Sequence, residues 1–489
     1  MGKVVVIGSG VAGLACAIRL KAKGYEVTVV EANSYPGGKL TEFTSNGYRF
    51  DAGPSLFTMP TYVDELFEIS NEDPREYFNY KKLTHSCNYF YEDGTRLTAP
   101  SDPNEFATVM HDRLGENRRS VLRFLRKSGR MFRITAPVFL EKSLHKWSTY
   151  FSFSGIRGIL NLWRLRMFSS MDSVNRSSFS SYKTVQFFNR FATYNGSNPY
   201  KAPATLNVIP HLEFGYGTFL PENGMHDITA SLYQLALRKG IQFEFNTNVT
   251  EIVIDQKKVK GIKAGERTID AELVVSNMDV YHTYKRLMKG FELPQRIEEA
   301  EPSSSALIFY WGIKGSFPEL DLHNVFFTRE YAKEFESIFN YGSIYPDPTI
   351  YINITSKHVS KDAPEGCENW FVMINVPANK GQDWDTMVTR ARINILEKLR
   401  RILGKDLKPY IETEEVLDPV KIESRTSSRK GSLYGSSSNS RFSAFFRHPN
   451  FKSGVKGLYF CGGSVHPGGG IPLCLLGAKI VASMVKPIK

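Results

Sequence analysis

Three glycines and one acidic residue near the start of the chain have the spacing of a phosphate-binding turn. Gly8, Gly10 and Gly13 form the pattern G-x-G-x-x-G. In such a pattern the first glycine permits a tight turn, the second lets the backbone approach a pyrophosphate, and the third lets a helix pack closely on a strand. Glu31 follows about twenty residues later, where an acid accepts hydrogen bonds from a ribose. These residues predict a dinucleotide site.

The site requires a strand, a turn, a helix and a second strand in that order. Residues 4–7 are apolar and predict the first strand, and residues 26–30 predict the second. Between them, apolar residues recur at helical spacing and Gly24 follows the helix end (Val11, Leu14, Ala15, Ile18). The helix N-terminus offers free N–H groups to the phosphates. The alternative is a glycine-rich turn in an α/β domain that binds no nucleotide.

A second glycine-rich stretch lies near the end of the chain. Residues 462–471 read GGSVHPGGGI and lie between two apolar runs, 457–461 and 471–484. We expect a buried strand, a loop whose bare backbone passes close to a flat ligand, and a helix with Pro472 in its first turn. His466 in this loop is a candidate catalytic base. The alternative is that His466 packs beside the ligand or turns outward.

Composition limits the class of protein. A chain of 489 residues is too long for one ordinary core, so two or more domains are expected. The five cysteines are odd in number and widely spread, which favours a reducing compartment and predicts no metal site. The net charge of +12 is compatible with a solvated surface, a nucleic acid or an anionic membrane. Because the basic residues are scattered and no nucleic-acid module is present, we expect no nucleic-acid partner and favour a membrane surface.

Three blocks of the sequence resemble the flavin-dependent amine oxidase and phytoene desaturase superfamily. After Glu31 come the turn Gly37-Gly38-Lys39 and the stretch GYRFDAGPSLFTMP, residues 47–60. In the superfamily, arginine is commoner than lysine at the position of Lys39. The lysine ammonium is a single point charge, whereas an arginine guanidinium can bind a phosphate through two parallel hydrogen bonds. Residues 218–279 form the middle block and end in an S-N-x-D motif, and residues 457–485 resemble the closing flavin motif.

The resemblance implies FAD as cofactor and an α/β fold. The expected architecture is a Rossmann-like, GR2-type FAD-binding domain over residues 1–70, 218–284 and 421–489. A discontinuous α+β substrate-binding domain covers 71–217 and 285–420. The implied cofactor-binding residues surround the turns, strands and closing loop described above (Gly8, Ser9, Gly10, Ala12, Gly13, Glu31, Ala32, Gly38, Lys39, Pro54, Ser55, Val249, Gly463, Ser464, Gly469, Gly470, Ile471, Pro472).

Two segments leave alternatives open. Residues 154–168 place apolar residues and a tryptophan on one helical face beside arginines. Such a helix is typical of a membrane-surface anchor, and equally of an ordinary buried helix. We expect the enzyme to be cytoplasmic and bound peripherally to the inner face of the cell membrane.

The second segment is residues 424–446. They are rich in serine and would suit a flexible linker, but we favour an ordered loop near the active site.

Within the superfamily, FLPENGM and SVHPGGGIP resemble bacterial carotenoid desaturases, most closely the hydroxycarotenoid 3,4-desaturases. The resemblance implies an enzyme that removes two hydrogens from adjacent carbons, one of them as hydride to FAD. The implied substrate is a 1-hydroxylated carotenoid of the 1'-hydroxy-γ-carotene type, with oxygen or a quinone as final electron acceptor.

The substrate segments supply many aromatic residues and no visible charged clamp, which suits an apolar substrate (Phe151, Phe153, Trp163, Phe168, Phe179, Phe187, Phe188, Phe191, Tyr194). Alternative functions are a phytoene or dehydrosqualene desaturase, an FAD-dependent carotenoid isomerase or saturase, an amine oxidase, and a binding protein like the GDP-dissociation inhibitors. The last of these would lack a complete flavin site.

Overall fold

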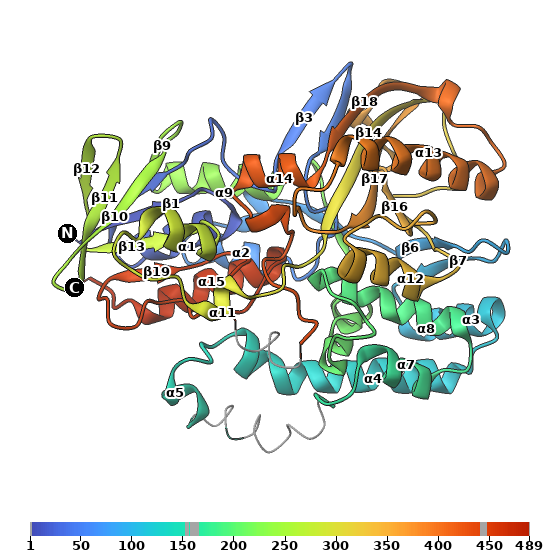
Figure 1. Ribbon diagram of the computed structural model, residues 1–489, viewed down its shortest axis with the longest axis horizontal. Coiled ribbons are helices and arrows are strands. Elements are labelled where there is room, and N and C mark those ends of the chain that lie inside the picture. The colour runs from blue at the N-terminus through green and yellow to red at the C-terminus, as the bar shows by residue number, and fades with distance from the viewer. Residues whose placement is uncertain (1, 152–155, 157–165, 441–446, 489) are drawn as a thin grey trace.

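The computed structural model describes residues 2–151, 156, 166–440 and 447–488. Figure 1 shows two sheets side by side, each with helices packed against it, and a group of helices below the second sheet. The predicted amphipathic helix over 154–168 falls almost entirely outside the described residues.

The first sheet is parallel and has the strand order β19-β13-β1-β2-β9. Its strands are β1 (Lys3–Ile7), β2 (Glu26–Val30), β9 (Gln242–Glu244), β13 (Leu273–Ser276) and β19 (Leu458–Phe460). Strands buried on both faces are continuously apolar, which explains the valine run of β1. The predicted strand, helix and strand at the N-terminus are confirmed, with helix α1 at Val11–Lys21.

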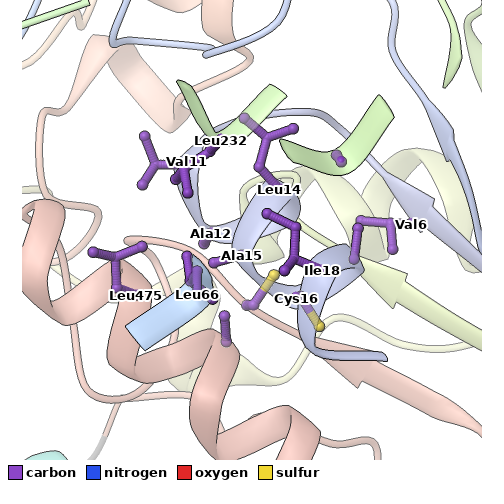
Figure 2. Packing of buried hydrophobic residues seen from close by; sticks show 14 of the residues in the cluster. Val6, Val11, Ala12, Leu14, Ala15, Cys16, Ile18, Leu66, Leu232 and Leu475 are labelled. Carbon is purple, nitrogen blue, oxygen red and sulfur yellow. The ribbon is translucent and has the colours of Figure 1, made fainter. Parts of the chain in front are cut away.

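Three helices cover α1 and the sheet. These are α2 (Thr61–Glu68), α9 (Asp227–Arg238) and α15 (Ile471–Met484). Figure 2 shows how Leu14 and Ile18 of α1 lie in one cluster with Leu66, Leu232 and Leu475 from these helices. The core therefore joins segments that are far apart in the sequence. A small antiparallel sheet of β10 (Val249–Asp255), β11 (Lys258–Ala264) and β12 (Arg267–Asp270) lies beside it.

The second sheet has the order β18-β14-β17-β16-β15-β6-β7. Its strands are β6 (His85–Phe90), β7 (Arg96–Pro100), β14 (Ser305–Lys314), β15 (His323–Phe326), β16 (Ile350–Asn353), β17 (Cys367–Val376) and β18 (Ile411–Leu417). Helix α13 (Trp384–Leu403) packs on one face through Ile395 and Leu399. The hairpin of β3 (Glu42–Ser45) and β4 (Tyr48–Asp51) packs on the other.

The helices below this sheet are α3 (Pro103–Leu114), α4 (Arg118–Thr135), α7 (Met171–Ser178) and α8 (Tyr182–Asn189). Phenylalanines of α3, α4 and α8 form their common core with Tyr89 of β6. Shorter elements complete the fold: α5 (Trp147–Tyr150), α10 (Val280–His282), α11 (Gln295–Glu298), α12 (Tyr331–Glu336), α14 (Pro419–Thr426), and the paired strands β5 (Tyr80–Lys82) and β8 (Phe219–Pro221).

The strands of the first sheet come from residues 1–70, 218–284 and 421–489, and those of the seven-stranded sheet from 71–217 and 285–420. Two contacts cross these ranges: β5 pairs with β8, and the β3–β4 hairpin packs on the second sheet. The domain boundaries themselves stay a prediction. Of the serine-rich segment 424–446, residues 441–446 lie outside the described residues. Within 424–440, Ser432, Ser437 and Ser438 are buried, which agrees with a packed loop rather than a linker.

Candidate active site

A cavity of about 1520 Å³ lies between the two sheets. The residues that follow four parallel strands line one part of it: Gly8 after β1, Glu31 after β2, Asn277 after β13 and Gly462 after β19. Ligands of open α/β sheets bind outside the carboxyl ends of the strands. Single-ligand pockets commonly measure about 300–1,000 Å³, so this cavity has room for a cofactor and a second molecule.

Nearly all the predicted cofactor residues lie in the wall of this cavity. Ser9 and Gly13 are the two exceptions, and both act on residues that do line it. Ser9 holds Glu31 through hydrogen bonds. Gly13 lies so close to the turn that a Cβ there would be 2.1 Å from the Gly8 carbonyl oxygen. The close helix–strand packing predicted for Gly13 is therefore confirmed.

The Glu31 carboxylate is buried and fixed by its neighbours. Its Oε2 accepts hydrogen bonds of 2.8 Å from the backbone N–H and the hydroxyl of Ser9. Its Oε1 accepts from the Asn33 backbone N–H at 2.9 Å and from the Asn33 side-chain amide at 3.1 Å. A carboxylate offers about four acceptor positions, and these four bonds fill them. A ribose hydroxyl would therefore replace the Asn33 side-chain amide, whose nitrogen also lies 3.4 Å from the Arg425 carbonyl oxygen. The acid is thus preorganised in the cavity wall.

Two helices begin at the cavity with backbone N–H groups that no described side chain caps. Helix α1 starts after Gly10 and α15 after Gly470. Gly470 has a φ of +106° and open space on the side where a Cβ would point. A helix N-terminus with free N–H groups is a ready anion site. The two uncapped termini, the glycines and the fixed acid fit the charged and planar parts of FAD.

Two cations, the half-buried Lys39 and the buried Arg447, hold the 424–440 loop against this end of the cavity. Lys39 donates to the carbonyl oxygens of Ser432 at 3.1 Å and Leu433 at 2.9 Å, and burial lowers the pKa of Lys39 to about 8. Arg447 donates to the carbonyls of Tyr434 and Gly463. The Lys39 amine thus anchors this loop. Its expected contact with a phosphate stays a prediction. Sequence reasoning missed Arg447, an isolated arginine outside any motif.

His466 does not line the cavity. Its ring is buried, and Nε2 lies 2.9 Å from the Lys142 carbonyl oxygen, to which the neutral ring donates. Burial lowers the pKa of His466 to about 4. The packing interpretation therefore describes this residue better than that of a catalytic base.

The substrate side of the cavity contains a charged pair that the sequence did not reveal. Arg190 Nη2 lies 3.4 Å from Glu213 Oε1, and the Tyr194 hydroxyl donates to the same oxygen. All three residues line the cavity. The expectation of a site without a charged clamp was wrong, because the partners are 23 residues apart and meet only in the fold.

Most of the aromatic residues predicted for the substrate site lie elsewhere. Phe179, Phe187, Phe188 and Phe191 pack in the helical core, and Tyr194 lines the cavity. Phe151 and Phe168 are exposed, while Phe153 and Trp163 lie outside the described residues. Helical spacing reveals a buried face but not what covers it. The apolar wall comes instead from residues such as Phe132, Leu206, Ile308, Phe371 and Met373.

The fold and the site define an FAD-dependent oxidoreductase, in which a parallel α/β sheet presents a cofactor cradle to a second, substrate-bearing sheet. Residues 11–485 match the family described as flavin containing amine oxidoreductase, and the chain belongs to this family. The α/β fold, the family and the FAD cofactor expected from the sequence are thereby confirmed.

Individual proteins similar to this chain include two enzymes named for carotenoids. The chain is 50% identical over 485 residues to a 1-hydroxycarotenoid 3,4-desaturase of Flavobacterium sp. (strain P99-3), covering 99% of each chain. It is 32% identical over 493 residues to a 4,4'-diapolycopene oxygenase of Methylomonas sp, covering 99% of this chain and 98% of the relative. Among solved structures, putrescine oxidase bound to putrescine has a similar fold, with a TM-score of 0.66, 14% identity, and coverage of 99% and 98%.

Proposed function

We propose that this protein is an FAD-dependent carotenoid desaturase that forms the 3,4 double bond of a 1-hydroxylated carotenoid. The observation that carries the proposal is the 50% identity, over almost the whole of both chains, to an enzyme with that name. The cavity agrees with it, since one continuous space joins the cofactor cradle to an apolar wall. A hydrocarbon substrate can therefore lie beside the cofactor without exposure to water.

The chain's own residues bind and orient such a substrate. Ile308, Phe371 and Met373 present apolar surface from the seven-stranded sheet, and Phe132 and Leu206 from the helical side. Each Å² of apolar surface removed from water contributes roughly 25 cal/mol, so a long polyene gains its affinity mainly from this wall. The same wall shields the carbons that it contacts from water.

FAD held by the Glu31 carboxylate and the N-termini of α1 and α15 would supply a two-electron acceptor for a hydride. The second hydrogen leaves as a proton, and the conjugated polyene delocalises the positive charge that develops between the two losses. A strong dedicated base is then less necessary, which agrees with the position of His466 outside the cavity wall. The uncapped N-terminus of α15 favours negative charge beside it by roughly 0.3–2 kcal/mol. The final acceptor, oxygen or a quinone, stays a prediction.

Product analysis tests this function. The holoenzyme is offered phytoene, lycopene and a 1-hydroxylated carotenoid in parallel, and the products are identified by mass and absorption. We expect loss of two hydrogens from the hydroxylated carotenoid alone. Repeated desaturation of phytoene with the hydroxylated compound ignored would favour a phytoene desaturase. A product of unchanged mass would indicate an isomerase, and a gain of hydrogen a saturase.

We also propose that the enzyme works at a membrane surface. Trp147 and Phe151 are 80% and 78% exposed, and Phe168 on the far side of the undescribed stretch is 78% exposed. Single exposed apolar residues are ordinary, but Trp147 and Phe151 are two large exposed aromatics only four residues apart, in and just after α5. Figure 1 shows α5, which carries Trp147, away from both sheets. Among the described residues, no helix combines the length and apolar character needed to cross a bilayer.

The same region connects to the cavity. Phe139, Leu140 and Leu144 line the cavity and directly precede α5 along the chain. A carotenoid dissolved in lipid could pass along these residues to the cofactor without entering water. The net charge of +12 adds attraction to an anionic surface.

A further inference from the structure

We propose that Glu213, His323 and Thr205 form the binding site for the substrate hydroxyl and so determine which carotenoid is accepted. The inference rests on the proposed function and deepens it. All three residues lie in the cavity wall and are at least nine-tenths buried. Each also has a polar side-chain atom without a hydrogen-bond partner among the described residues: Glu213 Oε2, His323 Nε2 and Thr205 Oγ1.

Glu213 is held so that one oxygen is used and the other is available. Arg190 and the Tyr194 hydroxyl both contact Oε1. Arg190 is itself enclosed by aromatic rings, with its guanidinium carbon 4.6 Å from the centre of the Phe191 ring and 5.1 Å from that of Tyr194. A buried ion pair loses much of its Coulombic gain to desolvation, so stability alone explains it poorly. Its arrangement leaves Oε2 as a preorganised acceptor in the cavity wall.

His323 supplies the complementary donor. The Asn353 side-chain amide donates to His323 Nδ1 at 3.2 Å, so Nδ1 acts as the acceptor and the ring proton lies on Nε2. Burial is the main cause that lowers the pKa of His323 to about 3, and the positive charge of Arg190 acts in the same direction. The ring is therefore neutral, and it lines the same cavity as the Arg190–Glu213 pair. An alcohol both donates and accepts one hydrogen bond, which Glu213 and His323 satisfy together.

The position of these residues matches the position of the hydroxyl. In a 1-hydroxylated carotenoid the oxygen is only a few bonds from C3 and C4, so its binding site must adjoin the cofactor cradle. His323 Nδ1 lies 2.7 Å from the Tyr351 hydroxyl, which lies 2.8 Å from the hydroxyl of Ser55 in the predicted cradle.

The Arg190–Glu213 side reaches the cradle by a second route. Asn195, next to Tyr194, accepts from Arg447 at 3.1 Å, and Arg447 donates to the Gly463 carbonyl oxygen at 3.1 Å. The polar residues of both routes thus lie between the substrate sheet and the cofactor cradle.

A site built to bind a hydroxyl rejects the analogue that lacks it, because its buried polar groups are then left unpaired. We expect the wild-type enzyme to prefer the hydroxylated carotenoid over the same molecule without the hydroxyl by about a hundredfold or more. The hydrocarbon could still enter the cavity, since the apolar wall is unchanged, but Glu213 Oε2 and His323 Nε2 would stay without a partner.

The test compares Thr205→Val and Glu213→Gln with the wild-type holoenzyme on this pair of carotenoids. Thr205→Val preserves shape and removes no hydrogen bond that the described residues make, so the variant should fold. We expect the preference for the hydroxylated carotenoid to fall about tenfold in Thr205→Val and more in Glu213→Gln, mainly through KM. Thr184→Val is the matched control, because the Thr184 hydroxyl is equally buried and unpartnered among the described residues but does not line the cavity.

Equilibrium binding of both carotenoids to the oxidised holoenzyme, followed by the shift of carotenoid absorption, gives a second readout. It separates this inference from the proposed function, since the hydroxylated carotenoid can bind selectively even where it is not desaturated. An unchanged preference in both variants overturns the inference. An equal loss for both carotenoids in both variants also overturns it, because a structural role acts on every substrate alike.

Discussion

The hydroxyl of Tyr351 lies 2.8 Å from the hydroxyl of Ser55 and joins the seven-stranded sheet to the cofactor cradle. The same Tyr351 oxygen lies 2.7 Å from His323 Nδ1. One part-buried hydroxyl thus connects a predicted cofactor residue with a residue of the substrate wall. This contact and the bonds of Arg447 to Asn195 and Gly463 both link the two halves of the cavity.

Tyr351→Phe removes this link and leaves two polar atoms with fewer partners. We expect the free energy of unfolding to fall by about 1–3 kcal/mol, the usual cost of leaving a buried polar group unpaired. Chemical denaturation of the holoenzyme measures it. Tyr345→Phe is the control, because Tyr345 hydrogen-bonds to Glu330 at an exposed position and should change stability by less than about 0.5 kcal/mol. Equal effects of the two substitutions would contradict the structural role of Tyr351.

Glu31→Ala should weaken FAD binding about tenfold to a hundredfold. A charged acceptor contributes roughly 1.5–3 kcal/mol, and its loss also releases Ser9 and Asn33. Titration of the apoprotein with FAD, followed by flavin fluorescence, measures the change. Glu266→Ala, in an exposed turn, should bind FAD normally. A Glu31→Ala protein that retains its yellow colour through extensive dialysis as well as the wild type would refute the assignment.

Gly470→Val should abolish FAD binding or turnover. At a φ of +106° any side chain is strained, and a Cβ there would point into open space in the cavity wall. Gly381→Val is a matched control, because Gly381 has a φ of +87°, similar open space and an exposed position away from the cavity. Both variants should lose a comparable amount of stability, whereas only Gly470→Val should lose flavin. Flavin content per protein and thermal midpoints separate the two effects.

The cofactor half of this site could be predicted from sequence because its residues act within short stretches. The turn at Gly8 and the acid at Glu31 belong to one strand, helix and strand unit, whose spacing is set by local geometry. The closing loop before α15 is equally local. Its glycines could be assigned to the ligand side because only backbone without side chains can pass close to a flat ligand.

The substrate half could not be predicted in the same way. Its polar residues come from separate helical turns and strands within 71–217 and 285–420, and they meet only when those helices pack on the seven-stranded sheet (Arg190, Thr205, Glu213, His323, Tyr351). No spacing rule connects them. The spacing of the phenylalanines in α8 is compatible with a ligand site and also with a helical core, and in the structure they belong to the helical core. The hydrogen bonds from the Lys39 amine to two backbone carbonyl groups could not be predicted either, because those carbonyls belong to a loop almost 400 residues later.

His466→Gln tests whether this histidine acts as a base or only packs. Burial lowers its folded pKa to about 4 from 6.5, so the unfolded chain binds the proton more tightly. Wild-type stability should therefore fall as the pH drops from 6.5 to 4, with a His466 contribution of up to about 3 kcal/mol. His466→Gln should remove that share, since its amide can still donate to Lys142 without titrating.

Denaturation curves across this pH range, compared between the two proteins, measure the His466 contribution. At neutral pH the His466→Gln variant should retain turnover within a few fold of the wild type. A loss of a hundredfold or more with full flavin content would restore His466 as a catalytic residue.

Binding to vesicles should depend on both charge and the aromatic residues near α5. We expect the protein to bind vesicles that contain anionic lipid, and salt to weaken this binding, because the Debye length is about 10 Å at 0.1 M. Insertion of a large aromatic side chain contributes roughly 1.5–3 kcal/mol, so Trp147→Ser and Phe151→Ser should each lower the partition coefficient about tenfold or more. Tyr341→Ser is the control, since Tyr341 is 71% exposed in a different part of the molecule. Co-sedimentation that ignores lipid charge, salt and all three substitutions would show that neither the charge nor these residues bring the enzyme to the membrane.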